Sequence, residues 1–308
     1  MKVLITGGTG MVGRNIHEAL TRANTYQVLR PDRTELDLED RRAVELYITE
    51  TCPDAIVHAA GLVGGIRANI ARPVEFLAVN LRIGTNVIDG AKDAGVPILL
   101  NIASSCMYPR EEKNPLGEES ILSGMLEPTN EGYAIAKIAA TRHCQYILQQ
   151  HNDLNYKTIV PCNLYGKYDH FDPENGHMIA SVIQRMHKAK EDNDPKMMIW
   201  GDGTARREFM FAGDLAGFVA RYLEKADELP DVMNVGLGQD FTIREYYEAI
   251  SHVIGYVGEF QNDLTKPVGM KQKLVSVARQ NCLGWAPGTT LEEGLRIVYD
   301  YYLATVDC

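Results

Sequence analysis

A glycine-rich turn between a strand and a helix constrains this chain more than any other feature of its sequence. Residues 2 to 6 (KVLIT) form a short apolar run, the next seven residues are GGTGMVG, and a helix is expected to begin near Met11. A diphosphate site needs that order, because glycines let the backbone approach phosphates and a helix N-terminus offers free N–H groups. The sequence therefore predicts a dinucleotide-binding turn. Its expected cofactor contacts are Gly7, Thr9, Gly10, Met11, Val12 and Gly13.

The second apolar run, YQVLR, indicates which dinucleotide binds. NAD-specific proteins usually place an acidic residue on the ribose 2′-hydroxyl at the end of this strand. Here the run ends in Arg30, and Arg33 follows. A guanidinium can pair with a 2′-phosphate through two hydrogen bonds, which favours NADP(H); the alternative is that both arginines are solvated loop charges. Asp37 and Leu38, in the sequence ELDL, are expected to border the adenine.

Strand-like and helix-like segments alternate through the first half of the chain. Apolar runs at 54–60, 97–103 and 157–166 are separated by helical patterns around 72–94 and from Tyr133 onward. Near-continuous apolar strands that alternate with helices are typical of a parallel sheet covered on both faces. We therefore predict an α/β protein with a Rossmann-type doubly wound sheet.

The sequence pattern changes after Gly166. A polar stretch, KYDHFDPENG, is followed by a helical pattern, the short strand KMMIW and a loop that enters another helix near residue 212. A further strand and helix are expected within 234–255, with Thr242 as the helix N-cap. We predict that residues 1–166 form an NADP-binding Rossmann domain, to which some later segments return, and that 167–308 form mainly a smaller α/β substrate domain. The crevice between the two is the expected ligand site.

The stretch from Asn101 to Lys137 holds a set of proton-handling groups. Tyr133 and Lys137 lie four residues apart in a helical pattern, so both side chains emerge on one helix face. The ammonium is expected to lower the pKa of the phenol and to hydrogen-bond a cofactor ribose. Ser104 follows the apolar run PILLNIA at the mouth of the predicted sheet, where a hydroxyl can bind a substrate carbonyl. YxxxK also occurs by chance on many helices, so the glycine turn that precedes it gives this pattern its weight.

Composition restricts the partners of the chain. Its 308 residues are 45% hydrophobic and 23% charged, enough for a large core, and a net charge of −10 argues against a broad nucleic-acid or membrane surface. No apolar run approaches the ~18 residues of a membrane span, and Met1-Lys2 leads directly into VLITG, so a cytoplasmic location is predicted. The six cysteines have neither CxxC pairs nor metal-ligand spacing, so we expect free thiols and no metal site.

Several short elements, taken in order and with their spacing, resemble one known family. They are GGTGMVG, HAAGLVGGI, SSCMYP, EPTNEGYAIAK, NLYG, an NGH before a helix, and WGDGTARREF. Over essentially its whole length the chain resembles the extended short-chain dehydrogenase/reductases, and its narrower elements are similar to those of the GDP-L-fucose synthase subfamily. The resemblance implies an NADPH-dependent 3,5-epimerase and 4-reductase that acts on GDP-4-keto-6-deoxy-D-mannose, with the GDP-sugar held mainly by the smaller domain.

The resemblance also implies catalytic residues. They are a reductase triad of Ser104, Tyr133 and Lys137, and an acid/base pair of Cys106 and His177. The chemistry suits them, because a 4-ketone acidifies the hydrogens on both neighbouring carbons. Inversion at C3 and C5 then needs a base on one face of the ring, an acid on the other, and donors to the enolate oxygen. Without the resemblance, a single cysteine after a strand is more often a buried apolar residue and a histidine at a helix start is often a cap.

Further contacts follow from the same resemblance. Arg185, Trp200 and Arg207 are expected to hold the GDP-sugar. Asn163 to Tyr165, chiefly Asn163 and Leu164, are expected to line the nicotinamide side of the site, and Tyr133, Lys137 and His177 are expected to contact the cofactor as well. The chain departs from the subfamily at Val268, where aspartate is common, and over 270–276, so the exact nucleotide sugar stays open.

Two other functions remain to be separated from this one. A simple 4-keto reductase or 4-epimerase on a related GDP- or UDP-sugar, including a GDP-heptose, would need the triad without Cys106 and His177. A catalytically silent NADP-binding scaffold would need neither set, and the presence of both Tyr133 and Lys137 argues against it. In similar proteins the helices around 72–94 and 132–151 pair two subunits, so a homodimer is predicted; the alternative is that their apolar stripe packs only on the sheet.

Overall fold

The computed structural model describes residues 1–173, 176–265 and 269–306. These residues form a six-stranded sheet in the order β10-β5-β4-β3-β1-β2, in which every pair of neighbours is parallel. The strands are β1 (Lys2–Thr6), β2 (Gln27–Leu29), β3 (Ala55–His58), β4 (Ile98–Ile102), β5 (Asn155–Pro161) and β10 (Val232–Val235). Because β2 and β3 lie on opposite sides of β1, the carboxyl ends of β1 and β3 border the crevice where such sheets bind ligands. The predicted doubly wound fold is confirmed.

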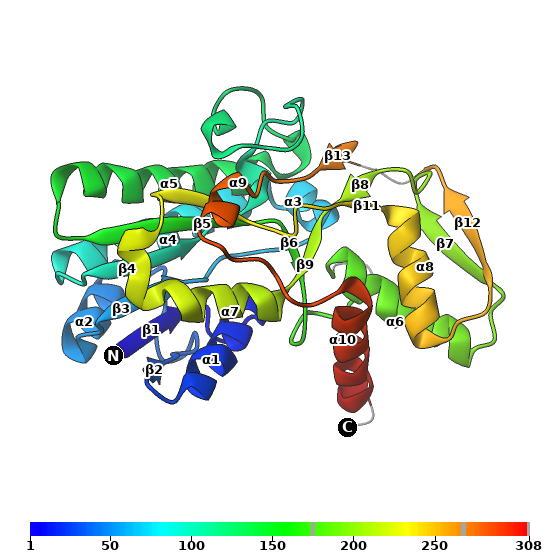
Figure 1. Ribbon diagram of the computed structural model, residues 1–308, viewed down its shortest axis with the longest axis horizontal. Helices are drawn as coiled ribbons and strands as arrows, with labels where there is room; N and C mark the ends of the chain where they lie inside the picture. The colour runs from blue at the N-terminus through cyan, green and yellow to red at the C-terminus, as the bar shows by residue number, and fades with distance from the viewer. Residues whose placement is uncertain (174–175, 266–268, 307–308) are drawn as a thin grey trace.

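Helices cover both faces of the sheet (Figure 1). Val3 and Ile5 of β1 pack on one face, with α1 (Met11–Ala23) and α7 (Ala212–Tyr222). Leu4 points to the other face, where it packs with the helices α2, α4 and α5. These three are α2 (Arg41–Thr51), α4 (Pro73–Asp93) and α5 (Glu131–Gln150). Alternating side chains of a fully apolar strand therefore serve two cores, as a strand buried on both faces requires.

A second group of elements, on the right in Figure 1, has its own aromatic core around Tyr246 and Tyr247. It consists of α6 (Met178–Glu191), β7 (Lys196–Trp200), α8 (Ile243–Ile254), β12 (Glu259–Asp263) and α10 (Leu291–Val306). Thr242 caps α8 as predicted: its hydroxyl accepts from the Glu245 backbone N–H at 3.1 Å, and the Glu245 carboxylate returns to the Thr242 backbone N–H at 2.6 Å. This reciprocal capping box fixes where α8 begins.

The segment 157–166, expected to be one strand, is divided in two. Strand β5 ends at Pro161, and β6 (Asn163–Tyr165) leaves the main sheet to pair with β9 (Phe209–Phe211). The stretch expected to be a loop before α7 contains β9 and also β8 (Arg206–Arg207), so that expectation was wrong. Both β6 and β9 are too short to be recognised from periodicity, because they are stabilised by pairing with a distant segment rather than by their own pattern.

The remaining elements are short. They are α3 (Ile66–Ala71), η1 (Ser105–Met107), η2 (Glu118–Ser120), η3 (Pro128–Asn130), η4 (Leu223–Glu228), β11 (Phe241–Thr242), β13 (Gln272–Lys273) and α9 (Ala278–Cys282). Strand β10 and helix α7 both follow residue 166, yet β10 belongs to the six-stranded sheet and α7 packs against it. The division of the chain into domains at 166/167 stays a prediction.

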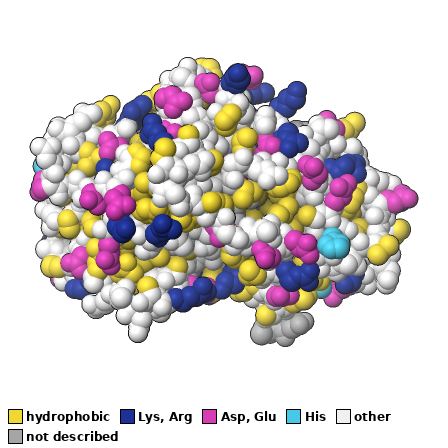
Figure 2. All heavy atoms as spheres, viewed as in Figure 1, with side chains coloured by type: hydrophobic (Ala, Val, Ile, Leu, Met, Phe, Trp, Pro, Cys, Tyr) yellow, Lys and Arg dark blue, Asp and Glu magenta, His cyan; other side chains and the backbone are white. Residues whose placement is uncertain are grey.

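Acidic and basic side chains are interspersed on the face shown in Figure 2. None of the helices in the described ranges is long and apolar enough to cross a membrane. Cys52, Cys106, Cys144, Cys162 and Cys282 are free thiols, as predicted, and Cys308 lies outside the described residues.

Candidate functional site

A large cavity opens at the carboxyl end of the parallel sheet. Its volume is about 740 Å³, and its walls come from the glycine turn, the ends of β1 and β4, and the helices α5 and α6. That volume lies within the range of small-molecule and cofactor sites. The site residues expected from the sequence line this cavity, with Arg30 and Tyr165 as the exceptions among the described residues.

The backbone of the glycine turn comes very close to its neighbours. Gly7 has φ +71°, and a Cβ there would lie 2.6 Å from the Ala60 Cα. A Cβ on Gly13 would collide with the carbonyl oxygen of Gly7. Gly10 precedes α1 without a side-chain cap, so the first N–H groups of this helix are free to meet an anion, and Met11, Val12 and Gly13 line the cavity. The turn therefore has the shape and the dipole that a diphosphate needs.

The two arginines expected at the ribose differ in position. Arg30 packs its side chain over Gly8 and donates from Nη1 to the Gly8 carbonyl oxygen at 3.2 Å. Arg33 lines the cavity beside Asp37 and Leu38, is 81% exposed, and pairs with Glu39 at 3.1 Å. Arg33 is therefore the better placed of the two to meet a phosphate in the cavity.

Ser104, Tyr133 and Lys137 come together at the end of β4. Ser104 is hydrogen-bonded to Tyr133, and the Lys137 ammonium donates to the Ile102 carbonyl oxygen at 3.1 Å. Burial raises the pKa of Tyr133 well above its usual range, the Cys106 sulfur raises it further, and the Ser104 hydrogen bond opposes both. The expected lowering of this pKa by Lys137 was wrong for the chain by itself, because the phenol is buried and the ammonium is directed to a backbone carbonyl. Burial also lowers the pKa of Lys137 to about 8.

Cys106 lies in the short helix η1, and two polar groups face its sulfur. The amide Nδ2 of Asn130 lies 3.2 Å from Sγ, and the ammonium of Lys273 lies 3.6 Å from it. Lys273 comes from β13, far along the chain, and is 9% exposed. A positive charge and an amide donor both stabilise a thiolate. The surroundings of Cys106 therefore suit a proton acceptor better than a purely apolar packing role.

His177 occupies the N-cap position of α6 and faces the same cavity. Its Nδ1 lies 2.8 Å from Oδ1 of Asp169, whose side chain is 3% exposed. The hydrogen bond with Asp169 raises the pKa of His177, and burial opposes this. A histidine paired with a buried carboxylate is able to hold and deliver a proton near neutral pH.

The residues expected to hold the sugar nucleotide line the same cavity. Trp200 lies beside two guanidinium groups, that of Arg67 at 4.9 Å and that of Arg185 at 5.8 Å from the centre of its ring. Arg185 also donates to the Met198 carbonyl oxygen at 2.6 Å. An indole and several fixed guanidinium groups can stack on a base and pair with phosphates.

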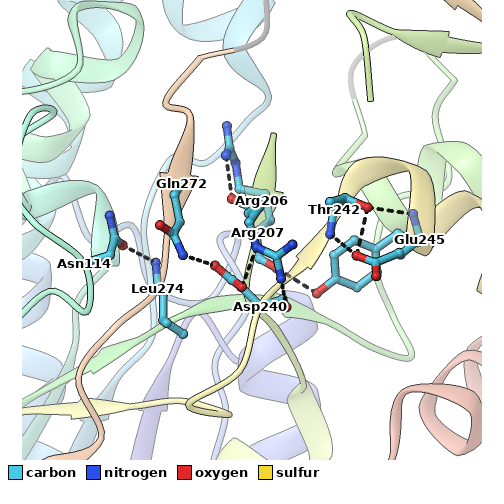
Figure 3. A network of polar contacts seen from close by, with 9 residues as sticks. Asn114, Arg206, Arg207, Asp240, Thr242, Glu245, Gln272 and Leu274 are labelled. Carbon is cyan, nitrogen blue, oxygen red and sulfur yellow. Dashed lines mark hydrogen bonds and ion pairs between the residues drawn. The ribbon is translucent and has the colours of Figure 1, made fainter. Parts of the chain in front are cut away.

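Arg207 is positioned by a polar network in the small sheet β11-β8-β13 (Figure 3). Its neighbour Arg206 donates to the Asp240 carboxylate at 2.8 Å, and Gln272 donates to the other carboxylate oxygen at 2.6 Å. The hydroxyl of Tyr246 donates to the backbone carbonyl of Arg207 at 2.9 Å. These contacts hold the backbone on both sides of Arg207, whose guanidinium remains at the cavity wall.

The expected nicotinamide wall is only partly as predicted. Asn163 and Leu164 line the cavity, and Asn163 donates to the Glu208 carbonyl oxygen at 2.9 Å. Tyr165 does not join them, because its ring is buried in the aromatic core against Phe211. Val268 lies outside the described residues.

The polar residues at this site that were missed in the sequence include Arg67 beside Trp200, and also Asn130, Asp169 and Lys273. Asn130 directly precedes α5, only three residues before Tyr133, and its place in the EPTNEGY element was the one available signal. Asp169 and Lys273 reach the site through the tertiary fold. No spacing rule relates Lys273 to Cys106 across 167 residues.

Comparison with known proteins agrees with this geometry. Residues 3–236 match the family model described as the NAD dependent epimerase/dehydratase family. The chain is 47% identical over 303 residues to the GDP-L-colitose synthase of Yersinia pseudotuberculosis, with 98% of each chain covered. It is also 47% identical over 302 residues to the GDP-L-fucose synthase of Azorhizobium caulinodans, covering 98% of this chain and 96% of that one.

A solved structure adds a further comparison. The GDP-mannoheptose C4 reductase of Campylobacter jejuni, determined with NADP bound, superposes with a TM-score of 0.89 at 29% identity, covering 98% of each chain. The family model matches most of the chain, and the two relatives match nearly all of it. The chain therefore belongs to the NAD dependent epimerase/dehydratase family.

Proposed function

We propose that this chain is an NADPH-dependent epimerase and reductase that converts GDP-4-keto-6-deoxy-D-mannose to GDP-L-fucose. The observation that carries the proposal is that one cavity is lined by Cys106 and His177 as well as by Ser104, Tyr133 and Lys137. A reductase alone needs the last three. The 47% identity to a GDP-L-fucose synthase over nearly the whole chain supports the same function.

The residues at the mouth of the sheet fit NADP(H). The free N–H groups at the start of α1 and the close approach at Gly7 and Gly13 suit the diphosphate, and Arg33 suits the 2′-phosphate. Lys137 would hydrogen-bond the nicotinamide ribose. When bound, the cofactor supplies the hydride for C4.

Epimerisation would use the two groups that a simple reductase does not need. The Cys106 thiolate, facing Lys273 and Asn130, would take a proton from a carbon beside the ketone. The C4 oxygen then carries enolate charge, which the hydroxyl groups of Ser104 and Tyr133 would stabilise by hydrogen bonds. His177, held by Asp169, would return a proton to the other face of the ring. The stereocentre is thereby inverted with no net change in protons.

Reduction would follow at the same carbonyl. As C4 accepts the hydride, its oxygen gains negative charge and takes the Tyr133 phenolic proton. The high pKa of Tyr133 in the chain by itself keeps this proton in place before the substrate arrives.

The experiment is a substrate panel with the wild-type protein. NADPH consumption is followed with GDP-4-keto-6-deoxy-D-mannose, a GDP-4-keto-heptose and a UDP-4-keto sugar, and each product is identified by NMR. We expect fastest turnover with the first substrate and GDP-L-fucose as the product. Reduction without inversion would favour a simple 4-reductase, for which the Campylobacter relative is the precedent. No turnover with any sugar would favour a silent NADP-binding scaffold.

We also infer a homodimer that works in the cytoplasm. Helices α4 and α5 pack side by side, joined by His143 and Asp89 at 3.1 Å, and they expose Val74, Ile135 and Tyr146. An apolar surface shared by two adjacent helices suits a second copy of the same surface. A monomeric mass by light scattering at micromolar concentration would contradict the dimer.

The cytoplasmic location is supported by the thiols. Five free thiols among the described residues suit a reducing compartment, and cell fractionation can test this location.

A further inference from the structure

Asp169 is a buried carboxylate with few hydrogen-bond partners. Its Oδ1 lies 2.8 Å from His177 Nδ1 and accepts the backbone N–H of His170, also at 2.8 Å. Among the described residues, its Oδ2 is buried with no hydrogen-bond partner. A buried carboxylate with an unsatisfied oxygen is costly to keep, so its placement opposite the His177 ring requires an explanation.

The hydrogen bond determines which nitrogen of His177 can react. When Nδ1–H donates to Asp169, the proton carried by Nε2 is the one left for exchange. The ring lines the cavity and its side chain is 40% exposed. Asp169 thus selects the tautomer and the orientation in which Nε2, rather than Nδ1, is presented to a substrate.

Asp169 also counteracts an unfavourable electrostatic position. His177 is the N-cap of α6, where the positive end of the helix dipole disfavours an imidazolium. The charged or titratable groups that line the same cavity include Cys106, Tyr133, Lys137 and Arg207 from other elements and Arg185 from α6 itself. In the part of the chain that the structure describes, Asp169 is the acidic group in contact with the ring, and the pKa of His177 is raised despite the helix end.

The segment that carries Asp169 is anchored to the first helix of the dinucleotide-binding half. Lys167 pairs with Glu18 of α1 at 2.7 Å, and the hydroxyl of Tyr168 donates to the same carboxylate. The guanidinium of Arg14 lies 3.8 Å from the centre of the Tyr168 ring. Asp169 therefore follows two residues that are fixed on α1, the helix that begins at the glycine turn.

We propose that Asp169 is a positioning residue for the proposed epimerisation, which orients His177 through Nδ1 and keeps a transferable proton on Nε2. The anchor on α1 holds this carboxylate in register with the cofactor-binding turn. The proposal rests on the proposed function for its catalytic consequence, whereas the pairing of Asp169 with His177 can be tested without any substrate.

The first test is an NMR titration of the histidine ring carbons in the wild type, Asp169→Asn and Asp169→Glu, with His177→Ala to assign the signal. We expect the pKa of His177 to fall by about one unit in Asp169→Asn, since a carboxylate is replaced by a neutral amide, and to be restored in Asp169→Glu. The control is Asp172→Asn, on the same segment, whose carboxylate faces the exposed ring of His170 at 3.9 Å. An unchanged His177 pKa in Asp169→Asn would overturn the proposal.

The second test measures deuterium exchange at C3 and C5 of GDP-4-keto-6-deoxy-D-mannose in deuterated water with NADP⁺. At neutral pH Asp169→Asn should exchange roughly tenfold more slowly or worse, with KM and cofactor affinity unchanged. The alkaline limb of its exchange-rate profile against pH should move to lower pH. The reason is that an imidazolium with a lower pKa loses its proton at a lower pH. Equal rates in Asp169→Asn and Asp172→Asn would overturn the role. If the wild type itself does not exchange, the proposed function fails, and the NMR titration still decides the pairing.

Discussion

The ammonium of Lys137 lies 5.9 Å from the centre of the Tyr133 ring, one turn further along α5. Lys137 is 6% exposed, and its polar contact is the Ile102 carbonyl oxygen at 3.1 Å. The chain thus keeps a buried cation on a neutral carbonyl oxygen. Such a placement costs stability and is typical of a functional site.

Replacing this cation with an apolar side chain of similar length should stabilise the fold. At ~1.4 kcal/mol per pKa unit, the fall of the Lys137 pKa from 10.5 to about 8 corresponds to a cost on the order of 3 kcal/mol near neutral pH. Between those two pKa values the unfolded chain binds the extra proton, so wild-type stability recovers as pH rises. Lys137→Met should therefore raise the free energy of unfolding at pH 7, by up to roughly that amount, while turnover is lost.

Urea unfolding of both proteins at several pH values measures this difference. The advantage of Lys137→Met should shrink as pH rises above about 8 and disappear by about the unfolded value of 10.5. Titrating groups that do not interact with Lys137 cancel in the comparison. A variant that is less stable than the wild type throughout this range would show that Lys137 is not penalised by burial.

Tyr133→Phe should separate reduction from epimerisation. The substitution removes the proton donor for the C4 oxygen and leaves Cys106 and His177 in place, so hydride transfer should fall by a factor of ~100 or more. Exchange of the C3 and C5 hydrogens with deuterated water should persist, although more slowly, because Ser104 remains as a donor to the enolate. Stopped-flow NADPH oxidation and NMR measure the two steps. Complete loss of exchange with intact hydride transfer would assign Tyr133 the wrong role.

The features that the sequence predicted correctly are those in which neighbouring residues determine the structure. The glycines at the start of α1 are needed for one turn, YxxxK lies on one helix, and Thr242 with Glu245 forms its capping box within four residues. The apolar runs become parallel strands because each is buried on both faces. Such features depend on backbone geometry over a few residues, which a single sequence records.

The features that were missed depend on distant packing. Lys273 reaches Cys106 only because β13 pairs with β8, and Asp169 follows Lys167, which pairs with Glu18 of α1. Tyr165 turns away from the cavity because β6 leaves the main sheet for β9. The raised pKa of Tyr133 comes from burial, which the spacing of YxxxK does not report. In each case the determining contact joins segments that are far apart in the sequence.

Arg33→Ala and Arg30→Ala test the cofactor preference, and the structure now distinguishes them. Arg33 lines the cavity, so its loss should weaken NADPH binding by on the order of 1.5 kcal/mol, or about tenfold, and leave NADH nearly unaffected. Because Arg33 is exposed to solvent, this loss of binding free energy lies at the low end of the range for a charge-assisted hydrogen bond. Arg30, held on the Gly8 carbonyl, should weaken both cofactors equally by displacing the glycine turn. KM values for both cofactors in both variants provide the measurement. Equal losses of NADPH and NADH in Arg33→Ala would contradict the assignment.

Cys106→Ser is the sharpest test of the two-step proposal, because serine keeps the shape and removes the base. A hydroxyl ionises far less readily than a thiol of reference pKa near ~8.5, even with Lys273 and Asn130 beside it. Deuterium incorporation at C3 and C5 with NADP⁺ should therefore fall by ~100-fold or more, with cofactor affinity unchanged. Cys282→Ser, at an exposed thiol in α9, is the matched control and should exchange at the wild-type rate. If Cys106→Ser and His177→Ala both exchange as fast as the wild type, epimerisation is not performed by this pair and the simple reductase is the better function.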